Sequence, residues 1–276
     1  TQHFLWIQGP FVSLGMYYGA AGVNVAHELI HRTDKEWDKL VGRWLLAFTW
    51  DTGFAIEHVH GHHRNVGTEL DPATAKRGEY IWAFVFRSTV GQWIAAKRHE
   101  DERLKRKGEP NNIITNRFWR GQLMTGAVLA LYVTFLGPIG ILFSAYAGSI
   151  GKIYLEVVNY IEHYGLVRVP GTRVEARHSW DSHRRVSTGL FYNLMLHSNH
   201  HAIATRRYWE LEQTKESQAL VLPFGYMAMV FFAFTGPPFF KFTDKLLARW
   251  DRELASPGEI ALLKERGIYL GDKVAA

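Results

Sequence analysis

The chain has 276 residues, of which 47% are hydrophobic and 14% aromatic, enough apolar side chains for one large domain. It contains no cysteine, which excludes thiolate-ligated haem, iron–sulfur clusters and CxxC redox chemistry within the chain. The net charge is +6 at pH 7, and lysines and arginines stand in short blocks beside apolar runs, as at 97–107. This pattern is typical of a cytoplasmic membrane face and not of a nucleic-acid-binding protein. Taken alone, 97–107 also fits an ordinary solvated helix, because acidic residues are mixed into it.

Two regions are long and apolar enough to cross a bilayer. Residues 4–26 carry no charged side chain, and a helix of that length spans a hydrocarbon core of about 30 Å. Residues 121–151 are also uncharged, and Gly137-Pro138 in the middle predicts a hairpin of spanning helices over about 120–136 and 139–162. One span followed by a hairpin leaves every histidine motif on the same side of the membrane.

Other apolar segments contain charges or prolines. The segments 36–57 and 81–96 have helical apolar stripes interrupted by charged residues, which favours helices at the membrane interface over spans. The segment 217–240 is uncharged but contains prolines, so spanning and re-entrant arrangements both stay open. The tail from 241 is charged. Together these segments predict an all-α integral membrane protein with transmembrane helices and a cytoplasmic histidine-rich cap.

Eight of the fourteen histidines fall into three motifs, HxxxH, HxxxHH and HxxHH. These comprise His27 and His31; His58, His62 and His63; and His197, His200 and His201. Positions i, i+3 and i+4 share a helix face, with Cβ atoms about 5–6 Å apart, so we expect each motif to aim its imidazoles at one point. Eight aimed imidazoles exceed what one ion can use, which predicts two metal ions. We expect 190–201 to form the helix of the third motif, and His163 is a ninth candidate ligand.

Isolated histidines are more often structural than metal-binding. We interpret His3, His99, His178 and His183 in this way. His60 lies inside the second motif, but it points about 200° round a helix from His58, which favours a surface or outer position.

Metal-bound imidazoles need hydrogen-bond acceptors that orient them. Several acidic or amide residues near the candidate ligands could be these acceptors. Alternatively, the glutamates are solvated at the membrane surface and the aspartate only caps a turn. The candidates are Glu28, Glu57, Asp71, Asn159, Glu162 and Asn199. Imidazole suits zinc, copper, iron and nickel, so the ligand type alone does not identify the metal.

These motifs resemble those of the integral-membrane non-haem di-iron family that contains fatty-acid desaturases and hydrocarbon hydroxylases. Within it, the chain is similar to bacterial alkane 1-monooxygenases and to xylene monooxygenase hydroxylase subunits. The matching motifs are His-Glu-Leu-Ile-His at 27–31, Glu-His-x-x-Gly-His-His at 57–63, Asp-Pro-Ala-Thr at 71–74, Asn-Tyr-Ile-Glu-His-Tyr-Gly at 159–165 and His-Ser-Asn-His-His-Ala at 197–202. The fourth of these is typical of the hydroxylase branch.

The resemblance implies that the eight motif histidines and His163 bind two iron ions, with O2 as co-substrate. It implies that a terminal methyl group of an n-alkane loses a hydrogen atom and becomes a primary alcohol. Electrons would come from rubredoxin and an NAD(P)H-dependent rubredoxin reductase, at the cytoplasmic face of a multi-pass protein in the bacterial inner membrane. One hydroxylase domain would cover 1–276, with the N-terminal spans of the relatives missing here.

Two features favour the xylene branch. Alkane hydroxylases usually have Asp at the position of Asn199, and the tail at 250–259 resembles the xylene type. That alternative implies an aryl-methyl substrate and an iron–sulfur reductase as the electron donor. A fatty-acid desaturase is a further alternative. A metal transporter fits least, because transporters place their ligands near the bilayer midplane, whereas these motifs lie at helix ends beside charged loops.

Overall fold

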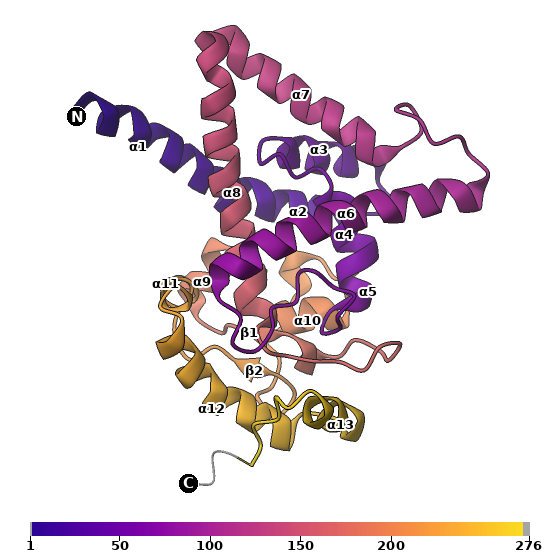
Figure 1. Cartoon of the computed structure of the whole chain (residues 1–276), viewed down its shortest axis with the longest axis vertical. Coiled ribbons are helices and arrows are strands. Elements are labelled where there is room, and N and C mark those ends of the chain that lie inside the picture. Colours follow the sequence, from indigo (N-terminus) through magenta and orange to yellow (C-terminus); the bar gives the residue numbers. More distant parts are fainter. Residues whose placement is uncertain (1, 273–276) are drawn as a thin grey trace. The chain divides into compact units, whose positions relative to one another are not determined.

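The computed structural model describes residues 2–272, with side chains from residue 8 onward (Figure 1). The side chain of His3 and those at the start of the predicted span 4–26 therefore lie outside the described residues. The chain divides into two compact units, Thr1–Gly61 with Val90–Leu155 and His62–Thr89 with Glu156–Ala276, each of which is considered by itself. That 1–276 forms one functional domain stays a prediction.

Helices build the first unit. In chain order they are α1 (Gln2–Tyr17), the π-helix η1 (Tyr18–Val23), α2 (Asn24–Ile30), α3 (Glu36–Ala47), α4 (Phe54–Glu57), the π-helix η2 (His58–His62, its last residue in the second unit), part of α6 (Ile81–Lys107), α7 (Arg117–Leu136), the 3-10 turn η3 (Gly137–Ile139) and most of α8 (Gly140–His163).

The predicted helix over 4–26 is confirmed, since α1, η1 and α2 follow one another without a break and α2 continues into the first histidine motif. The π-helical turn in the middle was not predicted. Within it, a Cβ on Gly19 would lie 2.8 Å from the ring of Tyr154, so only glycine permits this approach to α8. That this helix spans a membrane stays a prediction, since the one candidate span found among the described residues lies elsewhere, at Arg117–His163.

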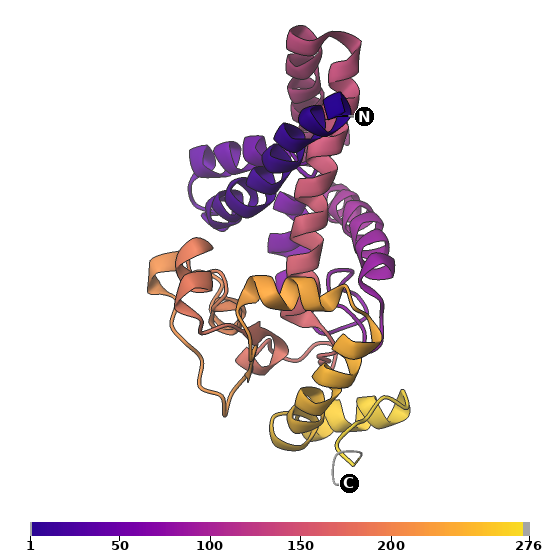
Figure 2. The same cartoon turned by 90° about the vertical axis from the view of Figure 1, so that its left-hand side faces the viewer.

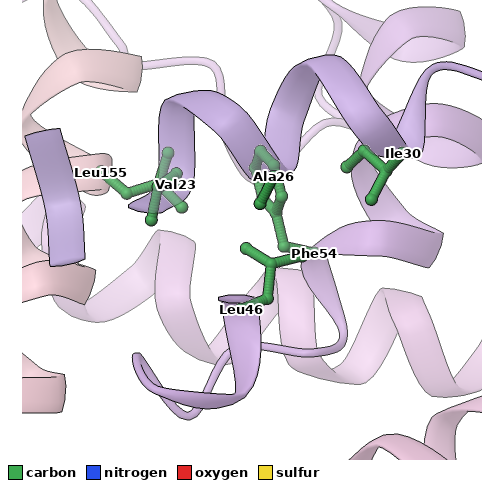
Figure 3. Close-up of a cluster of buried hydrophobic side chains, with 6 residues drawn as sticks. All are labelled: Val23, Ala26, Ile30, Leu46, Phe54 and Leu155. Carbon is green, nitrogen blue, oxygen red and sulfur yellow. The ribbon is translucent and has the colours of Figure 1, made fainter. Parts of the chain in front are cut away.

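The apolar core of the first unit holds α2 against its neighbours. Figure 3 shows its six buried side chains, which come from η1, α2, α3, α4 and α8: Val23, Ala26, Ile30, Leu46, Phe54 and Leu155. A Cβ on Gly42 would lie 3.0 Å from Ile30 Cγ2, which shows how closely α3 approaches α2. Burial of these side chains from water therefore fixes α2, which carries His27. It also fixes α4, which leads into the second motif.

The prediction of one helix over 36–57 is wrong between α3 and α4. The backbone of Trp50 has a φ of 57°, in the left-handed region, and its indole Nε1 donates to Ser144 Oγ at 3.1 Å. The next residue, Asp51, pairs with Lys152 at 2.6 Å. These polar contacts with α8 replace the helix that the apolar stripe favoured.

The hairpin over 120–162 is confirmed. Figures 1 and 2 both show α7 and α8 joined at the turn η3. Asn116 caps α7, since its Oδ1 accepts from the backbone N–H of Phe118 and of Trp119. Within residues 2–272, Arg117–His163 is the one segment long and apolar enough to cross a membrane, with a mean hydropathy of 2.1 in its best window and only 11% of that window buried. Exposed apolar side chains over this length fit contact with lipid.

The second unit combines short helices with a minimal sheet. Besides the ends of α6 and α8, it contains α5 (His63–Asn65), η4 (Ala176–His178), β1 (Trp180–Asp181), α9 (Arg185–Leu190), α10 (His197–Ala202), η5 (Tyr208–Glu210), β2 (Leu220–Val221), α11 (Tyr226–Ala233), α12 (Pro237–Glu253) and α13 (Pro257–Glu265). The strands pair in parallel, with Trp180 opposite Leu220. The all-α expectation is therefore correct apart from this two-residue pair.

The predicted helix over 190–201 is also wrong, because α9 ends where it should begin. Tyr192 and Asn193 have φ angles of 52° and 58°, which no helix tolerates, and Asn193 Nδ2 donates to the Tyr208 carbonyl at 3.0 Å. The third motif thus lies on the separate six-residue helix α10. For the segment 217–240, the sequence left spanning and re-entrant arrangements open. The structure divides it between α11 and α12 at Gly236, whose φ is 65°.

We predict that Asp51→Ala strongly destabilises the first unit. The substitution removes the carboxylate that pairs with Lys152, and loss of one partner from a buried ion pair costs about 3–5 kcal/mol. Lys97→Ala is the matched control, because its pair with Asp101 is at the surface and contributes about 1 kcal/mol or less. Thermal unfolding of the detergent-solubilised protein measures both, and equal shifts would contradict the prediction.

Candidate metal centre

Three histidines gather in the first unit. His27 lies on α2, His31 caps its C-terminal end, and His58 begins η2. The ring centroid of His27 is 4.7 Å from those of both His31 and His58, which are 5.2 Å apart. One ring nitrogen from each lies within 4.8 Å of the other two. Two sequence motifs that are 27 positions apart thus offer imidazoles to one point.

Gly61 allows the second motif to pack closely. A Cβ at this position would lie 2.6 Å from Glu57 Oε1 and 2.8 Å from His99 Nε2, so any other residue would displace one of them. Glu57 itself is only 1% exposed. The Glu-His-x-x-Gly-His-His pattern therefore has a steric reason, and His99, interpreted as structural, lies against this turn.

Four buried histidines converge in the second unit, and they come from η2, α8 and α10. Neighbouring Nε2 atoms are separated by 3.3 Å between His62 and His201, 3.1 Å between His163 and His197, and 2.9 Å between His197 and His201. One ligand nitrogen from each of the four lies within 4.8 Å of all the others. All four side chains are almost completely buried.

This donor set fits a metal ion. Imidazole nitrogens bound to a transition metal at about 2.0–2.1 Å lie about 3 Å from one another, as these do. Burial, followed by the charges of four neighbouring imidazoles, lowers the pKa of His201 well below its usual value, so its ring is neutral and can offer a lone pair. Glu162 Oε2 lies 3.3 Å from His197 Nε2 and adds an oxygen donor close by.

The His-His pairs of the second and third motifs diverge. His63 Nε2 lies 3.1 Å from His200 Nε2, whereas their neighbours His62 and His201 join the four-histidine cluster. Adjacent residues of a helix point about 100° apart, so a pair cannot aim at one point. The expectation that all imidazoles of one motif point to the same place is therefore wrong. Each motif histidine nevertheless lies beside at least one other histidine.

Asp71 orients His62. Its Oδ2 lies 2.9 Å from His62 Nδ1 and 2.6 Å from Thr74 Oγ1, and its Oδ1 accepts from the Ala73 N–H. An N–H at Nδ1 leaves the Nε2 lone pair directed at the cluster. Burial raises the pKa of Asp71, but the nearby His62 and the hydrogen bonds from His62 and Thr74 outweigh this and lower it overall. The Asp-Pro-Ala-Thr turn thus holds a charged carboxylate behind the cluster.

The segment 178–182 supports the cluster from another side. The His178 carbonyl accepts from His163 Nδ1 at 3.4 Å. Asp181 Oδ1 accepts from the Ser198 N–H at 2.8 Å, at the start of α10, and Ser198 Oγ donates to the Ser179 carbonyl at 2.9 Å. One short stretch of backbone therefore fixes both α10 and the ring of His163.

The C-terminal helices hold this segment in place. The Glu175 N–H donates to His178 Nδ1, so His178 Nε2 carries the proton that it donates to Glu259 Oε1 at 2.7 Å. Trp250 Nε1 donates to the Arg177 carbonyl at 2.7 Å. Sequence reasoning missed Asp181 and Glu259 and treated His178 as a bystander, because their positions follow no ligand spacing. Only tertiary contacts reveal them.

The other candidates lie in varied surroundings. Glu28 pairs with Arg32 at 3.0 Å, and Asn199 Oδ1 accepts from Arg206 at 3.1 Å. Asn159 is buried, and His60 is exposed and lines a cavity in the first unit.

We predict that Asp71→Asn lowers the metal affinity of the protein about 10–100-fold. The amide is uncharged and raises no ligand basicity, although it preserves the shape of the buried side chain. The measurement is metal content by mass spectrometry after dialysis against a graded chelator. Asp34→Asn, at an exposed position, is the control and should bind metal as the wild type does. Equal metal retention by both variants would contradict a role for Asp71.

The chain is similar to known proteins over most of its length. The family model described as fatty acid desaturase matches residues 4–233. The chain is 36% identical over 244 residues to alkane 1-monooxygenase 1 of Alcanivorax borkumensis, a match that covers 87% of this chain and 59% of that protein. It is 36% identical to alkane 1-monooxygenase of Ectopseudomonas oleovorans, covering 83% and 59% of the two chains.

A second kind of relative is also similar. The hydroxylase component of xylene/toluene monooxygenase from Pseudomonas putida is 31% identical over 261 residues, which covers 92% of this chain and 68% of that protein. The chain spans about three fifths of the length of the alkane 1-monooxygenases it matches. The histidine motifs, their buried convergence and these matches lead to one conclusion: the chain belongs to the fatty acid desaturase family.

Proposed function

We propose that the chain is the catalytic part of a membrane-bound, O2-dependent monooxygenase that hydroxylates hydrocarbon methyl groups with two iron ions. The convergence of four buried Nε2 atoms from His62, His163, His197 and His201 carries this proposal. The named monooxygenases among the relatives support the reaction class. The remaining five ligands would be His27, His31, His58, His63 and His200.

The protein's own residues would hold and orient this centre. When bound, the iron ions would supply the activation of O2 and the removal of a hydrogen atom from a methyl group. Asp71 sets the tautomer of His62, and Asp181 with Ser179 keeps α10 in register. Near-complete burial of the four-histidine cluster keeps bulk water away from it. Histidine ligands also withstand oxidation that would destroy cysteine thiolates.

The preferred substrate in this proposal is an n-alkane, which would become a primary alcohol. An aryl-methyl compound is the second candidate, because the xylene/toluene relative matches over more of its own length. Asn199 distinguishes them poorly: its Oδ1 accepts from Arg206, so an Asp there would pair with that arginine. The residue that differs between branches would thus alter a contact with Arg206, not a ligand.

These 276 residues contain no cysteine to bind an iron–sulfur centre or rubredoxin-type iron, so the electrons would come from a redox centre outside them. We propose rubredoxin and its NAD(P)H-dependent reductase for an alkane substrate, and an iron–sulfur reductase for an aryl-methyl substrate. The proposed location is the bacterial inner membrane, with several spans and the active site facing the cytoplasm. The uncharged stretch 121–151 of the hairpin α7–α8 supports insertion in a membrane.

The test is the identity of the products formed by cells that express the full-length protein together with rubredoxin and its reductase. Cells receive n-octane and p-xylene together, and gas chromatography identifies the products. Mostly 1-octanol supports the alkane assignment, and mostly 4-methylbenzyl alcohol supports the aryl-methyl one. A new double bond in cellular acyl chains would instead identify a desaturase. No oxygenated product from iron-loaded protein would contradict the proposal.

We predict that His200→Ala abolishes hydroxylation whereas His183→Ala keeps most of it. His200 lies against His63 and belongs to the proposed ligand set. His183 is partly exposed and touches Asp181 Oδ2, but Asp181 Oδ1 still holds Ser198 without it. Alcohol formation per bound iron separates the two variants. Equal losses would show that our division between ligands and bystanders is wrong.

A further inference from the structure

A second chemical feature lies in the first unit, and none of the residues that line it is a proposed metal ligand. A cavity of about 370 Å³ opens between α2, α3, α4 and the start of α7. Its lining includes the apolar side chains of Ile30, Leu40 and Ile56. It also includes three cationic side chains, Lys39, Arg43 and Arg117. A cavity with both kinds of lining suits a ligand that has an anionic head and a short apolar neck.

Arg43 is the least compensated of the three cations. Its Nη2 donates to the Arg117 carbonyl, while its Nε is buried and has no hydrogen-bond partner. Within residues 2–272 it forms no ion pair. Burial, and then the charges of Arg120 and Arg117, lowers the pKa of Arg43 to about 10, so the guanidinium is still charged at neutral pH. A buried cation without a counter-charge is costly, and a bound anion would remove that cost.

The acidic groups around the cavity do not neutralise it. Glu36 pairs with Lys39 at 2.5 Å, but its side chain is 88% exposed, so this surface pair is weak. Glu100 pairs with Arg117 at 2.8 Å and also with Arg103, which divides its charge between two cations. The cavity therefore keeps an excess of positive charge, centred on Arg43.

We propose that this cavity binds a phosphate group, held by Arg43 with help from Lys39 and Arg117. The guanidinium fork matches two phosphate oxygens, and the lysine adds a point charge. The phosphate could belong to a phospholipid headgroup or to a soluble phosphate. The apolar residues of the lining favour the lipid, whose glycerol carbons would lie against Ile30 and Leu40. Basic pockets at the cytoplasmic membrane surface bind anionic headgroups in this way.

Such a ligand would link α2, which carries His27, to α3 and α7 through non-covalent contacts. It would therefore stabilise the unit that presents the first histidine motif, whatever metal or substrate the protein uses. This inference is independent of the proposed hydroxylation, because its measurement needs neither metal nor turnover. Failure of one leaves the other standing.

The experiment is ligand-dependent thermal stability of the full-length protein in a neutral detergent, followed by intrinsic tryptophan fluorescence. The probes are phosphatidylglycerol, phosphatidylcholine and inorganic phosphate, each titrated separately. We expect saturable stabilisation by phosphatidylglycerol, with binding at least about tenfold weaker in Arg43→Gln, because the substitution removes the charge and the charge-assisted hydrogen bonds of the guanidinium. Saturation by inorganic phosphate as well, with the same dependence on Arg43, would identify a soluble source.

Two further variants make the outcome decisive. Arg106→Gln removes a 71% exposed arginine and should titrate as the wild type does. Leu40→Trp fills the cavity without changing any charge and should weaken binding as Arg43→Gln does. If Arg43→Gln does not fold, the comparison of Leu40→Trp with the wild type decides. Unchanged titrations in Leu40→Trp, or equal titrations in Arg43→Gln and Arg106→Gln, would overturn the proposal.

Discussion

The second unit depends on one electrostatic constraint. Four imidazole Nε2 atoms are held 2.9–3.3 Å from their neighbours in a site that water barely reaches. Neutral imidazoles cannot all donate to one another, and protonated ones would repel, as the lowered pKa of His201 indicates. A cation that accepts all four lone pairs resolves the conflict. The surrounding residues hold these four rings in place before the cation binds.

The support for these rings is polar and comes from residues far apart in the sequence. Asp71 holds His62 from a turn nine residues later, and Asp181 holds α10 from the strand β1. Glu259, near the end of the described chain, holds His178, whose carbonyl faces His163. Each of these carboxylates is buried, which costs free energy because it is removed from water. Hydrogen bonds to both of its oxygens offset that cost. The C-terminal helices are thus part of the metal site's scaffold, although they contribute no ligand.

Patterns of charge and spacing predicted the parts of this structure that depend on local chemistry. The uncharged stretch around Gly137-Pro138 had to form a hairpin, and the histidine spacings marked the right residues for clustering. The breaks at Trp50 and at Tyr192–Asn193 were missed, because tertiary hydrogen bonds there outweigh helical periodicity. The π-helical turns also have no clear sequence signal. Asp181 could not be found from the sequence for a further reason: it accepts from the N–H of a residue 17 positions away, and such a contact follows no spacing rule.

Iron stoichiometry with Mössbauer spectroscopy tests most directly whether the nine histidines bind two iron ions. Full-length protein is produced in cells supplied with enriched iron, purified in detergent and analysed without added metal. We predict two iron ions per chain, with a spectrum of high-spin iron in a nitrogen-rich environment. A single iron per chain, or stoichiometric zinc in its place, would contradict it.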